Sequence, residues 1–165
     1  MYRLRKLETK DASGILEWMK DSEINRFFQF NPDSITEESV LEFIENSMTD
    51  KNVNYAVVND MDEYLGTISL KNINSKDKNA EYAVSFRKMS IGTGAAAFAT
   101  KELLRIAFEE LRLHKVYLNV LSDNERAIKF YNKMGFEYEG EFKDHLYIDG
   151  KFRNIKWYAI RRDKA

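Results

Sequence analysis

The sequence contains no cysteine and only one proline among its 165 residues. The lack of cysteine excludes disulfides, thiolate metal sites and a cysteine nucleophile, and it fits a reducing compartment. The single proline argues against a long linker, and no hydrophobic run approaches the ~18 residues of a membrane span. The N-terminus lacks the apolar core of a signal peptide. We therefore expect one soluble, cytoplasmic domain over residues 1–165, with no membrane partner.

An excess of charge of either sign is also missing. The chain has 26 Lys and Arg against 27 Asp and Glu, so its formal net charge is -1. Nucleic-acid binders usually carry a basic excess, so we expect no nucleic-acid partner. The two histidines, His114 and His145, are not spaced as a metal pair, and no metal is predicted. Hydrophobic residues make up 44% of the chain, which is enough for a core.

The hydrophobic pattern predicts a mixed α/β domain. We expect strands at 2–7, 54–58, 64–70, 80–86, 116–121, 136–142 and 152–160. We expect helices after Thr9 or Asp11, after Thr36 and along 40–48, from 92 to 112, and from Ser122 or Asp123 to about Gly135. The strand–helix–strand unit over 80–121 implies a parallel crossover. Turn residues at 59–62 and 148–151 imply antiparallel hairpins.

Small residues follow one isoleucine where the third of these helices is expected to begin. The segment consists of Ile91, Gly92, Thr93, Gly94 and Ala95. A helix N-terminus presents free N–H groups that bind phosphates, glycines let a ligand approach the backbone, and Arg87 and Lys88 just upstream can add positive charge. The lysine of a P-loop is absent, and a dinucleotide fold is disfavoured because 116–120 ends without the expected acid. The alternative is a glycine turn that packs tightly against the sheet.

A second segment, 124–134, has the pattern of a helix. Four of its residues recur at three- and four-residue steps and form the face expected to be buried: Ala127, Phe130, Tyr131 and Met134. The hydroxyl of Tyr131 either satisfies a hydrogen bond in the core or reaches a reacting group. Three basic residues lie on the other side and form either a solvated surface or a cluster for a ribose phosphate: Arg126, Lys129 and Lys133.

These two segments resemble the signatures of the GCN5-related N-acetyltransferase (GNAT) superfamily, closest to its ribosomal-protein and small-amine acetyltransferases. The first signature, Gln/Arg-x-x-Gly-x-Gly/Ala, is read at 89–94, where Met89 replaces the usual glutamine or arginine. The second, Asn-x-x-Ala-x-x-Phe-Tyr-x-Lys-x-Gly-Phe, matches fully at 124–136. The resemblance covers essentially the whole chain. It implies a single-domain GNAT-like fold, with a mixed, mostly antiparallel sheet that contains a splayed pair of parallel strands flanked by helices.

The resemblance also implies a co-substrate, acetyl-CoA, bound in the split between 80–86 and 116–121. The backbone of Val84 and Phe86 would pair with the pantetheine arm, and the amides of 91–95 would bind the diphosphate. Side chains of Asn119 and Asn124 would contact the pantetheine, and Lys133 is a candidate for the 3′-phosphate. The hydroxyl of Tyr131 would protonate the leaving thiolate. The preferred general base is Glu81, and the alternative is that Glu81 holds a loop or pairs with an arginine.

The acceptor is expected to be a small-molecule or peptide amine. Segments 16–28 and 66–70 resemble those of relatives that acetylate nucleotide-linked amino sugars, and the N-terminal amine of a ribosomal protein is the close competitor. A polyamine is less favoured because no dense acidic cluster is apparent in the acceptor segments. His145 is a weaker candidate for an acceptor contact. A non-catalytic acyl-CoA sensor is the alternative from another class, and the chain is expected to be a monomer or a homodimer.

Overall fold

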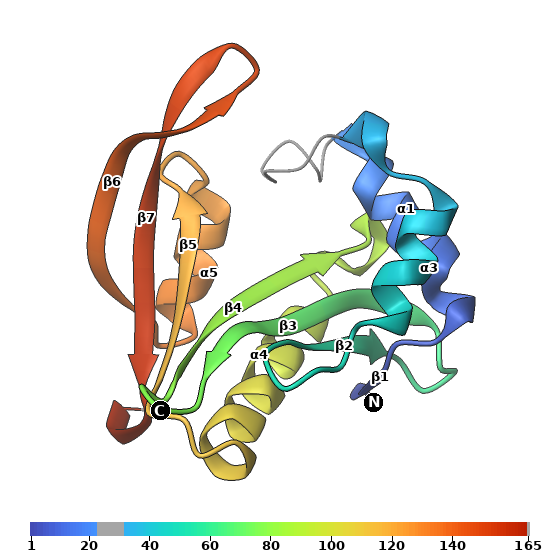
Figure 1. Cartoon of the computed structure of the whole chain (residues 1–165), viewed down its shortest axis with the longest axis horizontal. Helices are drawn as coiled ribbons and strands as arrows, with labels where there is room; N and C mark the ends of the chain where they lie inside the picture. Colours follow the sequence, from blue (N-terminus) through green and yellow to red (C-terminus); the bar gives the residue numbers. More distant parts are fainter. Residues whose placement is uncertain (23–31, 165) are drawn as a thin grey trace.

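The computed structural model describes residues 1–22 and 32–164, and the strands in them form one seven-stranded sheet (Figure 1). The strand order is β1-β2-β3-β4-β5-β7-β6. The strands are β1 (Arg3–Lys6), β2 (Val53–Val58), β3 (Tyr64–Asn74), β4 (Asn79–Phe86), β5 (Lys115–Leu121), β6 (Glu137–Ile148) and β7 (Lys151–Arg161). Only β4 and β5 pair in parallel, and every other neighbouring pair is antiparallel. The predicted mixed sheet and both hairpins are therefore confirmed.

The helices follow the predicted order along the described residues. The α-helices are α1 (Ala12–Lys20), α3 (Glu37–Glu45), α4 (Ala95–Arg105) and α5 (Glu125–Lys133). Short turns of other helix types are η1 (Thr9–Asp11), η2 (Pro32–Ser34), η3 (Lys88–Ser90), η4 (Ile106–Glu110, a π-helix) and η5 (Arg162–Lys164). No helix among the described residues is long and apolar enough to cross a membrane. Residues 23–28 of the segment 16–28, which resembles that of relatives that acetylate amino sugars, lie outside the described residues.

Helix α4 begins and ends at other residues than the sequence predicted. It starts at Ala95 because Gly92 and Gly94, with φ of 82° and 91°, adopt left-handed conformations that an α-helix excludes. Its α-helical part ends at Arg105, and the π-helical turn η4 follows. The two glycines thus form the loop before the helix and are not its first turn.

Capping residues mark the starts of α3 and α5. Thr36 caps α3 as predicted: its hydroxyl accepts a hydrogen bond from the Ser39 N–H at 3.1 Å. That helix ends at Glu45, so Met48 lies beyond it and bridges to Val53. The predicted cap of α5 by Ser122 or Asp123 is wrong, because the residue directly before its first turn is Asn124.

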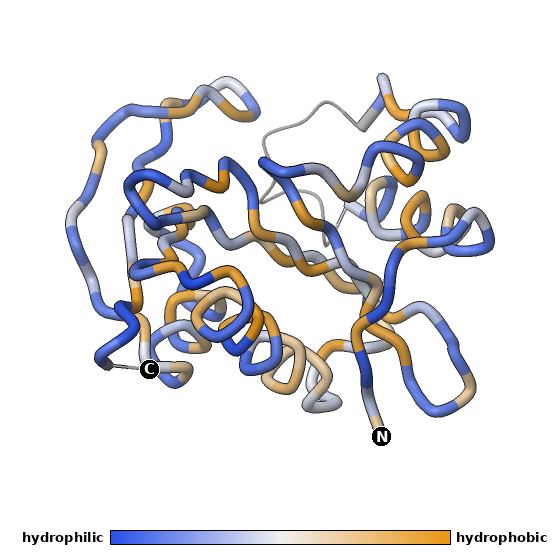
Figure 2. The backbone as a smooth tube through the Cα atoms, turned by 60° about the horizontal axis from the view of Figure 1, so that its bottom comes forward, coloured by the Kyte–Doolittle hydropathy of each residue, from blue (hydrophilic) through white to orange (hydrophobic). Residues whose placement is uncertain are grey.

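Hydrophobic side chains form a core on each face of the sheet. Alternation along β2 sends Val57 into the cluster that contains residues of α4, while Ala56 and Val58 pack with residues of α1 and α3. Helices α1 and α3 therefore cover one face, and α4 and α5 cover the other. Figure 2 shows the matching alternation of hydrophobic and hydrophilic residues along the helices and strands.

The parallel pair β4–β5 splays apart after a short contact. Its register runs from Asn79 opposite Lys115 to Glu81 opposite Tyr117, and no pairing of these two strands follows. The two strands visibly diverge beyond this point in Figure 1. The sheet therefore contains the predicted V-shaped split, whose apex lies beside Glu81.

Candidate active site

The split leaves backbone groups of β4 without a strand partner. The N–H of Arg87 donates to the carbonyl oxygen of Leu65 at 2.9 Å, on the β3 side. Backbone groups alternate in direction along an antiparallel strand, so those of Val84 and Phe86 point to the β5 side, where no described strand pairs with them. An extended chain with amide groups, such as pantetheine, can pair with such an edge. Pairing of the pantetheine arm with Val84 and Phe86 stays a prediction.

The loop between β4 and α4 presents free amide groups. Four N–H groups have no hydrogen-bond partner among the described residues: those of Gly92, Gly94, Ala96 and Ala97. A Cβ built on either glycine has no atom within 4 Å, so the surface is open here. Ile91 and Ala95 instead use their N–H groups within the loop, on the Lys88 carbonyl and the Thr93 hydroxyl. Free donors at a helix N-terminus bind anions well.

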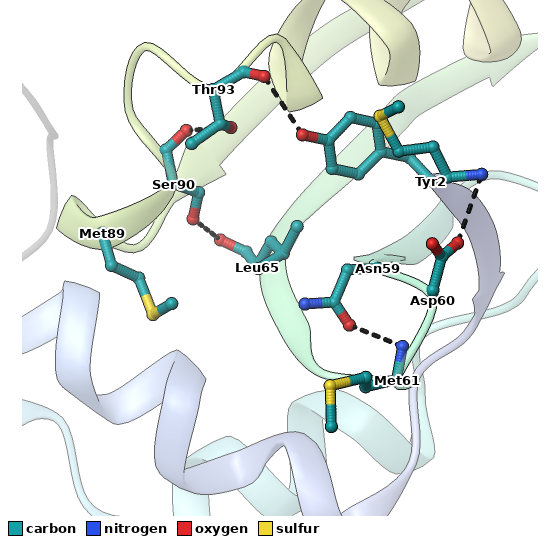
Figure 3. A pocket seen from close by; sticks show the side chains of 9 residues that line it. Tyr2, Asn59, Asp60, Met61, Leu65, Met89, Ser90 and Thr93 are labelled. Carbon is teal, nitrogen blue, oxygen red and sulfur yellow. Dashed lines mark hydrogen bonds and ion pairs between the residues drawn. The ribbon is translucent and has the colours of Figure 1, made fainter.

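Three hydrogen bonds, two of them to residues distant in the chain, hold the shape of this loop (Figure 3). The Ser90 hydroxyl donates to the Leu65 carbonyl at 2.8 Å, and the Thr93 hydroxyl donates to the Ser90 carbonyl at 2.6 Å. The Tyr2 hydroxyl donates to the Thr93 carbonyl at 3.0 Å. These residues line a pocket of about 360 Å³ together with the exposed side chain of Met89. The sequence analysis missed Tyr2 and Ser90, because both act through partners remote in the chain.

The two basic residues before the loop have different surroundings. Arg87 donates to both carboxylate oxygens of Glu17, at 2.9 and 3.0 Å, and to the Tyr64 carbonyl at 2.9 Å. The bonds to Glu17 raise the pKa of the guanidinium. Arg87 therefore ties α1 to β3, and its charge is matched by a carboxylate of the chain itself. Lys88, one residue further, is exposed on η3.

Tyr131 lies on α5, on the face of the sheet that α4 and α5 cover. Its ring packs edge-on against Tyr82 of β4, with centroids 5.7 Å apart, and against Phe136 at 5.9 Å. Burial raises the pKa of the phenol to about 12. Its hydroxyl makes no hydrogen bond to the described residues. The phenol is thus a protonated donor that remains free to reach a ligand.

Glu81 lies on the opposite face of the sheet, because it precedes Tyr82 in the same strand. Its carboxylate accepts hydrogen bonds from the side-chain amides of Asn119 at 3.0 Å and Asn72 at 3.3 Å. Asn119, expected to contact the pantetheine, therefore contacts Glu81. The pKa of Tyr117 is raised, first by burial and then by the negative charge of Glu81. Sequence analysis missed Asn72, which lies beyond the expected end of the strand at residue 70.

The remaining candidates lie around these groups. The side-chain oxygen of Asn124 accepts the Ala127 N–H at 3.3 Å, so it caps α5 at the mouth of the split. Lys133 is exposed in the last turn of that helix. His145 is exposed on β6 with its ring 5.1 Å from that of Phe142. The described residues contain no group of three His, Cys, Asp or Glu side chains that would hold a metal ion.

Comparisons with known proteins bear on this arrangement. The model of the family described as "Acetyltransferase (GNAT) domain" matches residues 2–137. The spermidine N(1)-acetyltransferase of Escherichia coli K12 is 31% identical over 153 residues, which cover 92% of this chain and 81% of that protein. The acetyltransferase PseH of Campylobacter jejuni is 28% identical over 143 residues, covering 86% and 87%.

Solved structures of other acetyltransferases have a very similar fold. The spermidine N-acetyltransferase of Vibrio cholerae, crystallised with CoA and spermine, superimposes with a TM-score of 0.91 at 24% identity and covers 99% of this chain and 96% of that one. The family match covers most of the strands and helices described above, including the split, the loop and α5. The chain therefore belongs to the GNAT family and is an N-acetyltransferase whose co-substrate is acetyl-CoA.

Proposed function

We propose that the enzyme transfers acetyl directly from acetyl-CoA to a primary amine of a small molecule, with Tyr131 as the acid and Glu81 as the base. The observation that carries this proposal is the position of these two groups on opposite faces of the sheet beside the β4–β5 split. The cofactor enters from the face of α4 and α5, where the loop amides lie. The acceptor enters from the face of Glu81, and the thioester lies between them.

The chemical steps follow from this placement. The ammonium group of the acceptor loses a proton to Glu81 through water, because only the free amine has a lone pair. The amine nitrogen attacks the thioester carbon, and the backbone N–H of Phe86, which points into the split, stabilises the oxyanion that forms. The carbon–sulfur bond then breaks, and the thiolate takes the proton of the Tyr131 hydroxyl. The nitrogen, positively charged after the attack, passes its extra proton through water to the phenolate, and Glu81 releases its proton to solvent. The products are an acetamide, CoA and one proton.

We further propose that the acceptor is a nucleotide-linked amino sugar. The surface near Glu81 consists of amide and aromatic groups: Asn72, Asn119, Tyr117 and, opposite Asn119 on β7, Trp157. Ring hydroxyls of a sugar can exchange hydrogen bonds with amides, and aromatic faces can stack on sugar or base rings. Tyr147 and Phe152, which are 67% and 65% exposed, lie apart from this surface, toward the tip of the β6–β7 hairpin.

A polyamine is the second candidate, and two observations favour it. Relatives of this chain are named spermidine N(1)-acetyltransferases. Helix α3 also carries Glu37, Glu38, Glu42 and Glu45 and no basic residue, so it presents negative charge to a polycation. The sequence analysis gave too little weight to this acidic helix.

The test is CoA release with a panel of acceptors: a nucleotide-linked amino sugar, the matching free amino sugar, spermidine and a ribosomal-protein N-terminal peptide. We expect the largest kcat/KM for the nucleotide-linked sugar. A larger value for spermidine would replace the first acceptor by the second. Tight binding of acetyl-CoA without turnover of any amine would identify a sensor and refute the proposed reaction.

A further inference from the structure

Side chains from three strands meet at the apex of the split. The amide of Asn119 on β5 donates to one carboxylate oxygen of Glu81 at 3.0 Å. The amide of Asn72 on β3 donates to the other oxygen at 3.3 Å. We call Asn72 and Asn119 the amide clamp. Since β4 and β5 stop pairing at Glu81 and Tyr117, the bond from Asn119 reaches across the point where the two strands separate.

A β-bulge brings Asn72 to this place. The β3–β4 register passes from Lys71 opposite Glu81 to Asn74 opposite Asn79, so two residues of β3 face one of β4. Asn72 has a φ of 53°, and its backbone N–H donates to the side-chain oxygen of Asn52 at 3.2 Å. A regular strand would turn residue 72 to the face opposite residue 71. The bulge instead returns its amide to the carboxylate of Glu81.

We infer that Asn72 and Asn119 are positioning residues that hold the Glu81 carboxylate at the apex of the split, on the acceptor side. This inference rests on the proposed role of Glu81 as base. A glutamate side chain rotates about three bonds, and a donor on each oxygen fixes both the position and the plane of the carboxylate. Each oxygen retains a second lone pair for a water or an amine. Misplacement of a reacting group by about 1 Å costs up to about a hundredfold in rate.

The clamp can be tested at Asn72, where the side chain can be removed without changing the conformation of the backbone. Glycine adopts a φ of 53° without strain, so Asn72→Gly removes the amide and leaves the bulge intact. Lys78→Gly is the matched control, because Lys78 has a φ of 59°, is exposed and makes no contact with Glu81. Asn119→Val removes the other donor with a residue that favours strands.

We expect Asn72→Gly and Asn119→Val to lower kcat at saturating acceptor and acetyl-CoA by about fivefold or more. The Kd for CoA should stay within about twofold, and Lys78→Gly should keep the wild-type kcat. A parallel loss of CoA affinity would mean that the clamp shapes the cofactor site, which overturns the inference. A wild-type kcat in both clamp variants would also overturn the inference.

Two further measurements separate this inference from the proposed function. If Glu81→Gln keeps the wild-type kcat, the base assignment falls and the clamp falls with it. If Glu81→Gln loses activity while Asn72→Gly does not, only the clamp is refuted. A crystal structure of Asn72→Gly with CoA needs no acceptor: we expect the Glu81 carboxylate to leave its place, and an unmoved carboxylate overturns the inference.

Discussion

Gly94→Ala tests whether the loop before α4 binds the diphosphate of CoA, because its effect on stability can be measured apart from its effect on CoA affinity. Gly94 has a φ of 91°, and a Cβ there would meet no protein atom within 4 Å. The substitution therefore costs only the left-handed conformation of an alanine, about 1–2 kcal/mol in unfolding free energy. Gly150, in the turn between β6 and β7, has a φ of 76° and the same open surroundings. Gly150→Ala is therefore a matched control for the cost in stability.

The two variants should differ in cofactor affinity. A methyl group at residue 94 occupies the open space beside the free N–H groups of Gly92 and Gly94, where we place the diphosphate. Loss of one hydrogen bond to a charged group costs about 1.5–3 kcal/mol, so the Kd for CoA should rise about tenfold to a hundredfold. Gly150→Ala should keep the wild-type Kd.

Denaturant unfolding and titration calorimetry measure the two quantities. Calorimetry is repeated with 3′-dephospho-CoA, which keeps the diphosphate, and the loss in affinity caused by Gly94→Ala should be the same for both ligands. An unchanged Kd in Gly94→Ala would refute the diphosphate site. A loss seen with CoA alone would move the contact to the 3′-phosphate.

Three variants and one pH profile test other parts of the site. Tyr131→Phe should lower kcat at least about a hundredfold with little change in CoA affinity by calorimetry; an equal kcat would exclude the phenol as acid. Since burial raises the pKa of Tyr131 to about 12, the phenol keeps its proton at lower pH, and kcat measured from pH 7 to 10 should show no fall caused by its ionisation. Tyr2→Phe removes one hydrogen bond to Thr93 and should raise the Kd for CoA about twofold to tenfold. In Gly66→Ala, the new Cβ would lie 2.6 Å from the Ser85 carbonyl oxygen, so thermal unfolding should show a loss of about 1–3 kcal/mol.

Hydrophobic periodicity predicted the strands well where at least one face is buried, and less well where both faces are polar. β2 and β5 lie within a residue of their expected limits, because their side chains alternate into the core. β3 runs on to Asn74 and β6 to Ile148, well past the expected ends at 70 and 142. These extensions are largely exposed, and pairing with β4 and β7 holds them. A strand stabilised mainly by backbone pairing has no apolar pattern from which its ends could be predicted.

In the candidate site, features set by neighbouring residues were predictable, and contacts with distant residues were not. The place of the glycine segment and the helix face that carries Tyr131 were predictable, because neighbouring residues encode both. The left-handed turn was not predicted, since the helix was expected to begin at residue 92. The surroundings of Arg87 were not, since its partner Glu17 comes from a different element, 70 residues earlier. The sequence predicts a cation beside the phosphate loop, and the fold matches that cation with a carboxylate of its own. Residue type alone does not fix which charges are available to a ligand.

Left-handed backbone conformation is a second feature from which residue type alone does not predict function. The described residues include six non-glycine positions with positive φ: Asp62, Asn72, Lys78, Arg112, Asp144 and Asp149. Asparagine and aspartate tolerate this conformation with little strain, so a positive φ alone indicates no function. Asn72 differs because its bulge directs an amide to a carboxylate at the apex of the split. The contact that the conformation creates, and not the conformation itself, therefore links this residue to the reaction.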